Sequence, residues 1–196
     1  YGSAKRDCPL WQASAAAEEL YVRTFIALEL PELFEDEVMA LARQLRDVVD
    51  GRFMRRETYH VTLAFLGEVD EMGVRDAMAA LDEACVRRAA VELVPDGLGT
   101  FGRPRDATLW LGLRPVPELL ALAGDVRAAI DAYGVVYDRK TFRPHITLAR
   151  RARMPKGELP TLMFPEPSQA TCVTLFKSEL SSEGATYKSL YTIELA

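Results

Sequence analysis

The stretch Tyr59-His60-Val61-Thr62-Leu63-Ala64-Phe65 is similar to a second stretch, Pro144-His145-Ile146-Thr147-Leu148-Ala149. The copies contain the chain's only two histidines, and each histidine is followed by a β-branched apolar residue, then Thr, Leu and Ala. Short runs in which apolar and polar residues alternate, and which are rich in β-branched residues, favour strands. We therefore predict that both copies are strands and that the fold is organised around them.

The segments that precede the two copies follow the same order. Each half begins with a predicted strand, 22–30 or 108–113, that ends near a proline and leads into a helix and then a glycine. The helices are predicted from apolar residues three or four apart: Phe34, Val38, Leu41, Leu45 and Val48 in one half, and Leu119, Leu122, Val126, Ile130 and Tyr133 in the other. The copies lie 83 to 85 residues apart, as three pairs show: Thr24 and Thr108, Gly51 and Gly134, His60 and His145. Repetition at such a period predicts an internally duplicated fold.

The rest of the chain supplies further predicted elements. We expect the first motif strand to close at Gly67 and Asp70 to cap a helix. Four more segments are predicted from turn and strand residues: a short strand over 91–94, a loop over 95–104, an irregular connection over 153–167, and a hairpin formed by 170–180 and 187–195.

Length and composition limit the class of protein. The chain has 196 residues, of which 49% are hydrophobic, enough for one compact domain or two small packed lobes. Its net charge of −5 means that a site for a polyanion must rest on local positive charge. Three scattered cysteines predict neither a disulfide framework nor a thiolate metal site, and they favour a cytoplasmic setting.

The sequence predicts neither a membrane span nor a signal peptide. No segment approaches the length of about 20 continuous apolar residues that spans a bilayer, and no signal peptide is evident, so we expect no membrane partner. Residues 1–20 mix Gly, Ser, Ala and charged residues without periodicity. We predict that they are an expression tag or a flexible extension outside the fold.

Alternation along a strand places the His and the Thr of each motif on one face. Side chains two positions apart lie about 6.5 to 7 Å from each other, so His60 and Thr62 share a face while Val61 and Leu63 point to the other. The second motif follows the same rule. If the apolar partners enter a core, a duplicated fold brings two imidazoles and two hydroxyls to one site across a pseudo-twofold axis.

Such a set of groups suits phosphodiester chemistry. Imidazole titrates near neutrality, so one ring can take a proton from a nucleophile while the other gives a proton to a leaving oxygen. Thr hydroxyls can donate hydrogen bonds to non-bridging phosphate oxygens. Catalytic zinc usually has three protein ligands, so two histidines do not suggest it, and we expect neither a metal nor a cofactor. For either motif alone, the commoner explanation would be a structural histidine; the repeat argues against it.

The motifs resemble a known family. The two His-x-Thr-Leu sequences, with Phe25-Ile-Ala-Leu-Glu-Leu-Pro31, Gly99-Thr-Phe-Gly102 and Leu109-Trp-Leu-Gly112, are similar to the 2H phosphoesterases, specifically the RNA 2′,3′-cyclic phosphodiesterases historically called 2′-5′ RNA ligases. The resemblance covers Val22 to the C-terminus. It implies an α+β, bilobal, duplicated fold in one domain over 21–196, with two pseudosymmetric lobes, each a mostly antiparallel sheet with flanking helices, and an active-site cleft between them.

The resemblance also implies roles for residues. His60 would be the proton donor to the leaving ribose oxygen, His145 the proton acceptor that activates water, and Thr62 and Thr147 the phosphate-binding residues. A pseudosymmetric pair can exchange the first two roles when the reaction reverses.

Further residues are candidates for substrate binding. The segment 139–153 is basic and has no acidic residue, so Arg143 and Arg150 could meet RNA phosphates, or could simply lie on a solvated surface. Strict alternation would put Arg150 on the face away from His145, and only a bulge or a strand end would change that. Phe101 and Phe142 could stack on a base or pack in the core.

The sequence thus predicts an enzyme that opens 2′,3′-cyclic phosphate ends of RNA or nucleotides to 2′-phosphomonoesters without a metal, with reverse 2′-5′ ligation possible in principle. Its partners would be those nucleic acids, and the chain would be a monomer. Two alternatives stay open: another 2H reaction, on cyclic ADP-ribose phosphate or 2′-5′ oligonucleotides, or a non-catalytic RNA-binding module.

Overall fold

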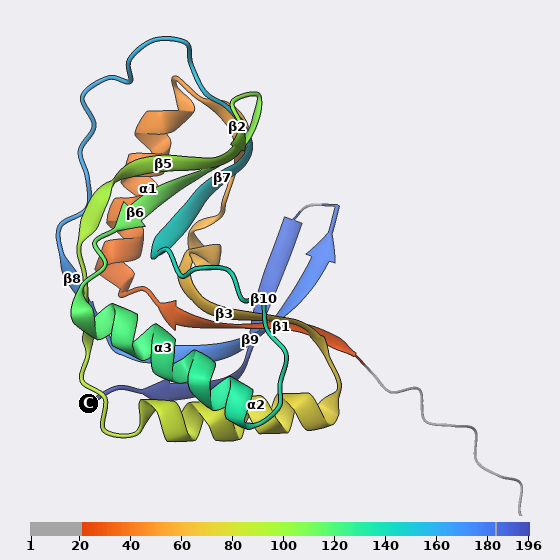
Figure 1. The fold of residues 1–196 in the computed structure, drawn as a ribbon. Helices are drawn as coiled ribbons and strands as arrows, with labels where there is room; N and C mark the ends of the chain where they lie inside the picture. The colour runs from red at the N-terminus through yellow and green to blue at the C-terminus, as the bar shows by residue number, and fades with distance from the viewer. Residues whose placement is uncertain (1–20, 183) are drawn as a thin grey trace, which may run out of the picture.

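Two four-stranded antiparallel sheets carry the two motifs, one motif each, in a computed structural model that describes residues 21–182 and 184–196 (Figure 1). The prediction for residues 1–20 lies outside the described residues. The first sheet has the order β10-β9-β1-β3, with β10 at Gly184–Glu194, β9 at Cys172–Ser181, β1 at Val22–Glu29 and β3 at His60–Val69. The second has the order β2-β7-β6-β5, with β2 at Asp50–Phe53, β7 at His145–Arg153, β6 at Asp106–Leu113 and β5 at Pro95–Arg103. A small third sheet pairs β4 at Val91–Leu93 with β8 at Ser168–Ala170.

The chain crosses between the two lobes within each half. After β1 in the first sheet, α1 (Glu32–Arg46) lies against the second sheet, where β2 also pairs, before β3 returns to the first sheet (Figure 1). After β6 in the second sheet, α3 (Pro117–Ala132) lies with α2 (Glu71–Cys85) on the first sheet, before β7 returns to the second. The guanidinium of Arg127 in α3 donates to the backbone oxygen of Leu63 in β3 at 2.9 Å. Each lobe is therefore completed by a helix from the other half of the repeat.

The helices begin where the sequence predicts, and α1 and α3 end earlier than expected. The Asp70 side chain caps α2 by accepting from the backbone N–H of Gly73 at 2.7 Å, as expected. The apolar stripe of α1 is buried from Phe34 to Leu45, but the helix ends at Arg46, and Val48 is 38% exposed while Val49 is buried. Tyr133, expected at the end of the stripe of α3, lies just past that helix and is 39% exposed. Both stripes were extended too far because spacing alone does not show where a helix stops.

The segment 95–104 was predicted to be a loop, and this is wrong: most of it forms strand β5. Its glycines serve packing as well as turns, because Gly99 pairs with Trp110 of β6, and a Cβ on Gly99 would lie 2.1 Å from the Trp110 ring. The prediction that the first motif strand closes at Gly67 is also wrong. Strand β3 continues to Val69 through Gly67, which has a φ of +73° at an irregularity in the pairing with β1. Strand β2 was not predicted.

Most remaining elements agree with the sequence, but the predicted strand 170–180 is interrupted at Thr171, and Ala170 belongs to β8, which was not predicted. Strands β9 and β10 form the expected antiparallel hairpin, and residues 154–167 contain neither helix nor strand. Within the described residues, no helix is long and apolar enough to cross a membrane. The architecture confirms the predicted α+β, bilobal and duplicated fold.

Candidate active site

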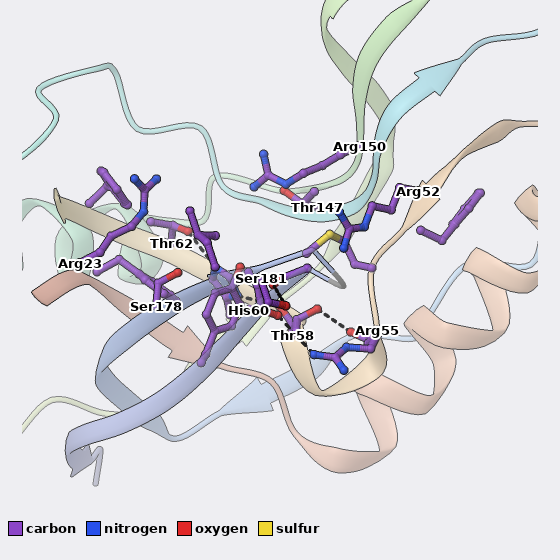
Figure 2. A pocket seen from close by; sticks show the side chains of 18 of the residues that line it. Arg23, Arg52, Arg55, Thr58, His60, Thr62, Thr147, Arg150, Ser178 and Ser181 are labelled. Atoms are coloured by element: carbon purple, nitrogen blue, oxygen red, sulfur yellow. Dashed lines mark hydrogen bonds between the residues drawn. The ribbon is translucent and has the colours of Figure 1, made fainter. Parts of the chain in front are cut away.

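A cavity of about 560 Å³ lies between the lobes and is lined by both motifs (Figure 2). His60 and Thr62 line it from β3, and His145 and Thr147 line it from β7. The intervening residues Val61, Leu63, Ile146 and Leu148 are fully buried in the core. The alternation predicted from the sequence therefore brings the four polar side chains of the two motifs to one cavity.

The first histidine is held by backbone and side-chain hydrogen bonds. A short 3₁₀ turn, η1 (Arg56–Thr58), precedes β3 and turns the backbone oxygen of Thr58 toward the ring, where it accepts from His60 Nδ1 at 2.8 Å. That bond assigns the ring proton to Nδ1 in the neutral form. Nε2 is then an acceptor, and the Thr62 hydroxyl donates to it at 3.0 Å.

The second histidine is held in the same way. His145 Nδ1 donates to the backbone oxygen of Arg143, two residues upstream, at 2.6 Å. The neutral ring therefore also has its proton on Nδ1, which leaves Nε2 as the atom able to exchange a proton. The two motifs thus present equivalent Nε2 atoms, although neither upstream segment shares its sequence with the other.

Burial lowers the pKa of both histidines below the ordinary value. The pKa of His60 falls to about 4, chiefly through burial, with smaller lowering by the charges of His145 and Arg150, while the hydrogen bond to Thr58 opposes the shift. The pKa of His145 is lowered chiefly by burial and also by Arg150, against the hydrogen bond to Arg143. Both rings are therefore neutral at pH 7.

A β-bulge of the same kind follows each motif. In β3, Ile26 and Ala27 of β1 pair with Ala64 and Thr62, so Leu63 is an extra residue. In β7, Leu109 and Trp110 pair with Ala149 and Thr147, so Leu148 is the extra one. Two consecutive residues after each Thr consequently face the core, and the alternation shifts by one position.

The bulges decide which residues come next in the cavity. Phe65 after the first motif and Arg150 after the second are 85 residues apart, like the two histidines, and both line the cavity. The side chain of Arg150 can face the cavity only with a bulge in its strand, and that bulge is present. From this position the positive charge of Arg150 lowers the pKa of both histidines.

Aromatic rings surround each imidazole. The His60 ring lies 4.8 Å from that of Phe25 and 5.3 Å from that of Tyr187, measured between centroids. The His145 ring lies 5.1 Å from that of Phe101 and 5.8 Å from that of Trp110. These contacts explain the desolvation of both histidines.

Three residues proposed for substrate binding are not among the lining residues of the cavity. Phe101 contacts His145 and Trp110 instead, and Phe142 packs against the core with the guanidinium of Arg127 5.4 Å from its ring centroid. The side chain of Arg143 is exposed, and its backbone oxygen is what reaches the site. Phe142 therefore follows the core-packing alternative that the sequence left open.

Several lining residues were not among the predicted site residues: Arg23, Phe25, Arg52, Arg55, Phe65 and Ser178. Arg52 and Arg55 could have been found as a basic cluster immediately before the first motif. Among the described residues, no group of three or more His, Cys, Asp or Glu side chains could hold a metal ion.

Comparisons with known proteins agree with this geometry. The profile of the 2′-5′ RNA ligase superfamily matches residues 34–175. An RNA 2′,3′-cyclic phosphodiesterase of Escherichia coli is 30% identical over 161 residues, which are 82% of this chain and 87% of that protein. One of Geobacillus stearothermophilus is 37% identical over 109 residues, which are 55% of this chain and 34% of that longer protein. The crystal structure of E. coli LigT complexed with 3′-AMP superposes with a TM-score of 0.75 at 27% identity, over 90% of this chain and 99% of the other.

Proposed function

The chain belongs to the 2′-5′ RNA ligase superfamily, and we propose that it is an RNA 2′,3′-cyclic phosphodiesterase that hydrolyses cyclic phosphate ends of RNA or nucleotides to 2′-phosphomonoesters. One observation carries the proposal. Two histidines with the same backbone anchoring of Nδ1 face one cavity, each beside a Thr and with Arg150 nearby. Because each Nε2 is left to exchange a proton, the site has the acid and the base that opening a cyclic phosphodiester requires.

The reaction assigns one proton transfer to each histidine. His145 Nε2 takes a proton from water as the water oxygen attacks phosphorus. The bond between phosphorus and the ribose 3′ oxygen breaks, and protonated His60 Nε2 gives its proton to that oxygen. The product carries a 2′-phosphate and a 3′-hydroxyl, and the proton gained by His145 restores the balance when it passes to His60 through solvent.

The hydroxyls and the arginine stabilise the phosphorane-like transition state. The Thr62 hydroxyl donates to neutral His60 Nε2, and protonation of Nε2 frees that hydroxyl to donate to a phosphate oxygen instead. Thr147 occupies the corresponding place in the second motif. Arg150 supplies a positive charge to the oxygens on which negative charge develops.

The low pKa of His60 is consistent with a proton donor that becomes protonated when substrate binds. A bound phosphate anion offsets the burial that lowers the pKa, so the protonated ring becomes more favourable when substrate enters. Once protonated, a histidine of low pKa is a strong acid for the leaving oxygen.

The same groups can run the reaction with another nucleophile. If the 5′-hydroxyl of a second RNA takes the place of water, attack on the cyclic phosphate and departure of the 3′ oxygen form a 2′-5′ linkage. Microscopic reversibility then makes cleavage of that linkage a reaction of the same site.

A direct test is incubation of the purified protein with a 2′,3′-cyclic mononucleotide and with a short RNA that bears the same end, in EDTA. We expect a 2′-phosphate product, with one oxygen from solvent when the reaction is run in ¹⁸O-labelled water. Absence of turnover with either substrate, or its loss on addition of EDTA, would contradict the metal-free two-histidine mechanism. Binding of the RNA without turnover would favour the non-catalytic module, and turnover of cyclic ADP-ribose phosphate or 2′-5′ oligonucleotides alone would favour another 2H reaction.

A further inference from the structure

The wall of the cavity is more cationic than a single cyclic phosphate requires. The described residues that line it include four arginines, Arg23, Arg52, Arg55 and Arg150, and no Asp or Glu. Figure 2 shows Arg52 and Arg55 on one side of His60 and Arg23 on the other. In a chain with a net charge of −5, such a concentration of arginines marks a place for an anion.

Arg52 and Arg150 form a like-charged pair across two strands. They are direct partners in the antiparallel register of β2 and β7, and both line the cavity. Directly opposed residues have Cβ atoms roughly 4.5 to 5.5 Å apart, and like charges at such positions are destabilising. Among the described residues, neither guanidinium has a carboxylate partner, whereas the nearby Arg56 pairs with Asp36 at 2.6 Å. An anion bound between or beside the two guanidinium groups would relieve this repulsion.

The side chain of Arg52 is also confined. The β9–β10 hairpin of the other lobe reaches it at Gly184, where a Cβ would lie 2.6 Å from a guanidinium nitrogen of Arg52. Arg55 lies at the same rim, where it donates to the backbone oxygen of Ala185 at 3.3 Å and pairs with Glu57 at 3.2 Å. Arg52 is therefore the less neutralised of the two, and it reaches the cavity between the lobes.

We propose that Arg52, with Arg55 beside it, binds a second phosphate of the substrate: the 5′-phosphate of the nucleotide that carries the cyclic end. This inference rests on the proposed function. The cyclic phosphate lies between the two histidines, and Arg150 there is the cross-strand neighbour of Arg52. A ligand with two phosphates on one ribose could thus meet both arginines. The preferred substrate class is then an RNA 3′ end or a 5′-phosphorylated nucleotide, in preference to a nucleoside 2′,3′-cyclic monophosphate.

The binding test uses product-like ligands that differ by one phosphate. We expect adenosine 2′,5′-bisphosphate to bind about tenfold more tightly than adenosine 2′-monophosphate, as one extra charge-assisted contact would give. Arg52→Gln should remove most of this preference and make Kd for the bisphosphate less dependent on salt, because one charged contact is lost. Arg52→Lys should restore part of both, and Arg105→Gln, at an exposed turn outside the cavity, controls for net charge.

The turnover test separates the phosphate from the rest of the RNA. The substrates are a nucleoside 2′,3′-cyclic phosphate, its 5′-phosphorylated form and a dinucleotide with the same cyclic end. We expect the last two to share an increase of about tenfold in kcat/KM that Arg52→Gln reduces. Equal kcat/KM for all three, a gain for the dinucleotide only, or equal losses on all three in Arg52→Gln would overturn the inference while leaving the proposed function intact. If the native protein opens no cyclic phosphate, the proposed function fails. The binding test still measures whether the bisphosphate binds more tightly than the monophosphate.

Discussion

The two motif strands have the same backbone plan and different surroundings. Both histidines donate from Nδ1 to the carbonyl two residues upstream, and both strands carry a bulge one residue after the Thr. After the bulge, however, the first motif places Phe65 in the cavity and the second places Arg150. Duplication therefore supplied a symmetric frame for two imidazoles, and single side chains made the two halves electrostatically unequal.

The surroundings of the imidazoles differ in degree as well. His60 lies near Phe25 and Tyr187, its Nε2 is paired with Thr62, and its pKa is lowered to about 4. His145 has its own aromatic neighbours and a pKa that is also lowered. The two rings therefore differ in their neighbours, while burial is the chief cause of the lowered pKa in both.

The largest effect should come from removing either imidazole. His60→Ala and His145→Ala should each lower kcat on a 2′,3′-cyclic nucleotide by roughly 10²- to 10⁴-fold, because each removes one of two proton transfers. Thermal melting should show that both variants stay folded. A large loss of melting temperature in either variant, with activity lost in proportion, would instead assign that histidine a structural role.

Substitutions of Arg150 and Phe65, the residues that follow the two bulges, should have smaller and unequal effects on kcat/KM. Arg150→Gln should lower kcat/KM by about 10²-fold, as the loss of one donor to a developing oxyanion does, whereas Phe65→Leu should lower it by less. Arg150→Gln should also raise the pKa of both histidines, because its charge lowers them now. Both limbs of the pH profile of kcat/KM, one set by the base His145 and one by the acid His60, would then move to higher pH. Equal losses in the two variants would mean that the halves are alike in the transition state.

The smallest effect concerns stability. The folded pKa of His60 is about 4 and its unfolded value is near 6.5, so between these values the unfolded chain binds more protons. Stability from neutral His60 is thus complete above about pH 6.5 and is lost as the pH falls toward 4. The melting temperature should fall across this window and fall less steeply in His60→Gln. An unchanged slope would mean that His60 is not desolvated in the folded protein.

Much of the fold could be predicted because local signals agreed with it. The His-x-Thr-Leu strands, the cap at Asp70 and the stripe from Phe34 to Leu45 follow from period, capping chemistry and burial, which act over a few residues. Strand β5 was predicted to be a loop because its glycines are typical of turns. Their role at Gly99 depends on the ring of Trp110, which lies on another strand.

The candidate site, like the fold, could be predicted from the sequence only in part. The sequence by itself identified the duplication, the four motif residues that line the cavity, and the family, because two copies of a rare pattern carry information without any contact between them. Only the tertiary structure decided that Arg150 faces the cavity, that Arg52 lies opposite it, and that Phe142 packs against the core. A bulge and a cross-strand register are set by the partner strand, and here that partner is more than 30 residues away in the chain for β6 and almost 100 for β2. No local period in the sequence contains that information.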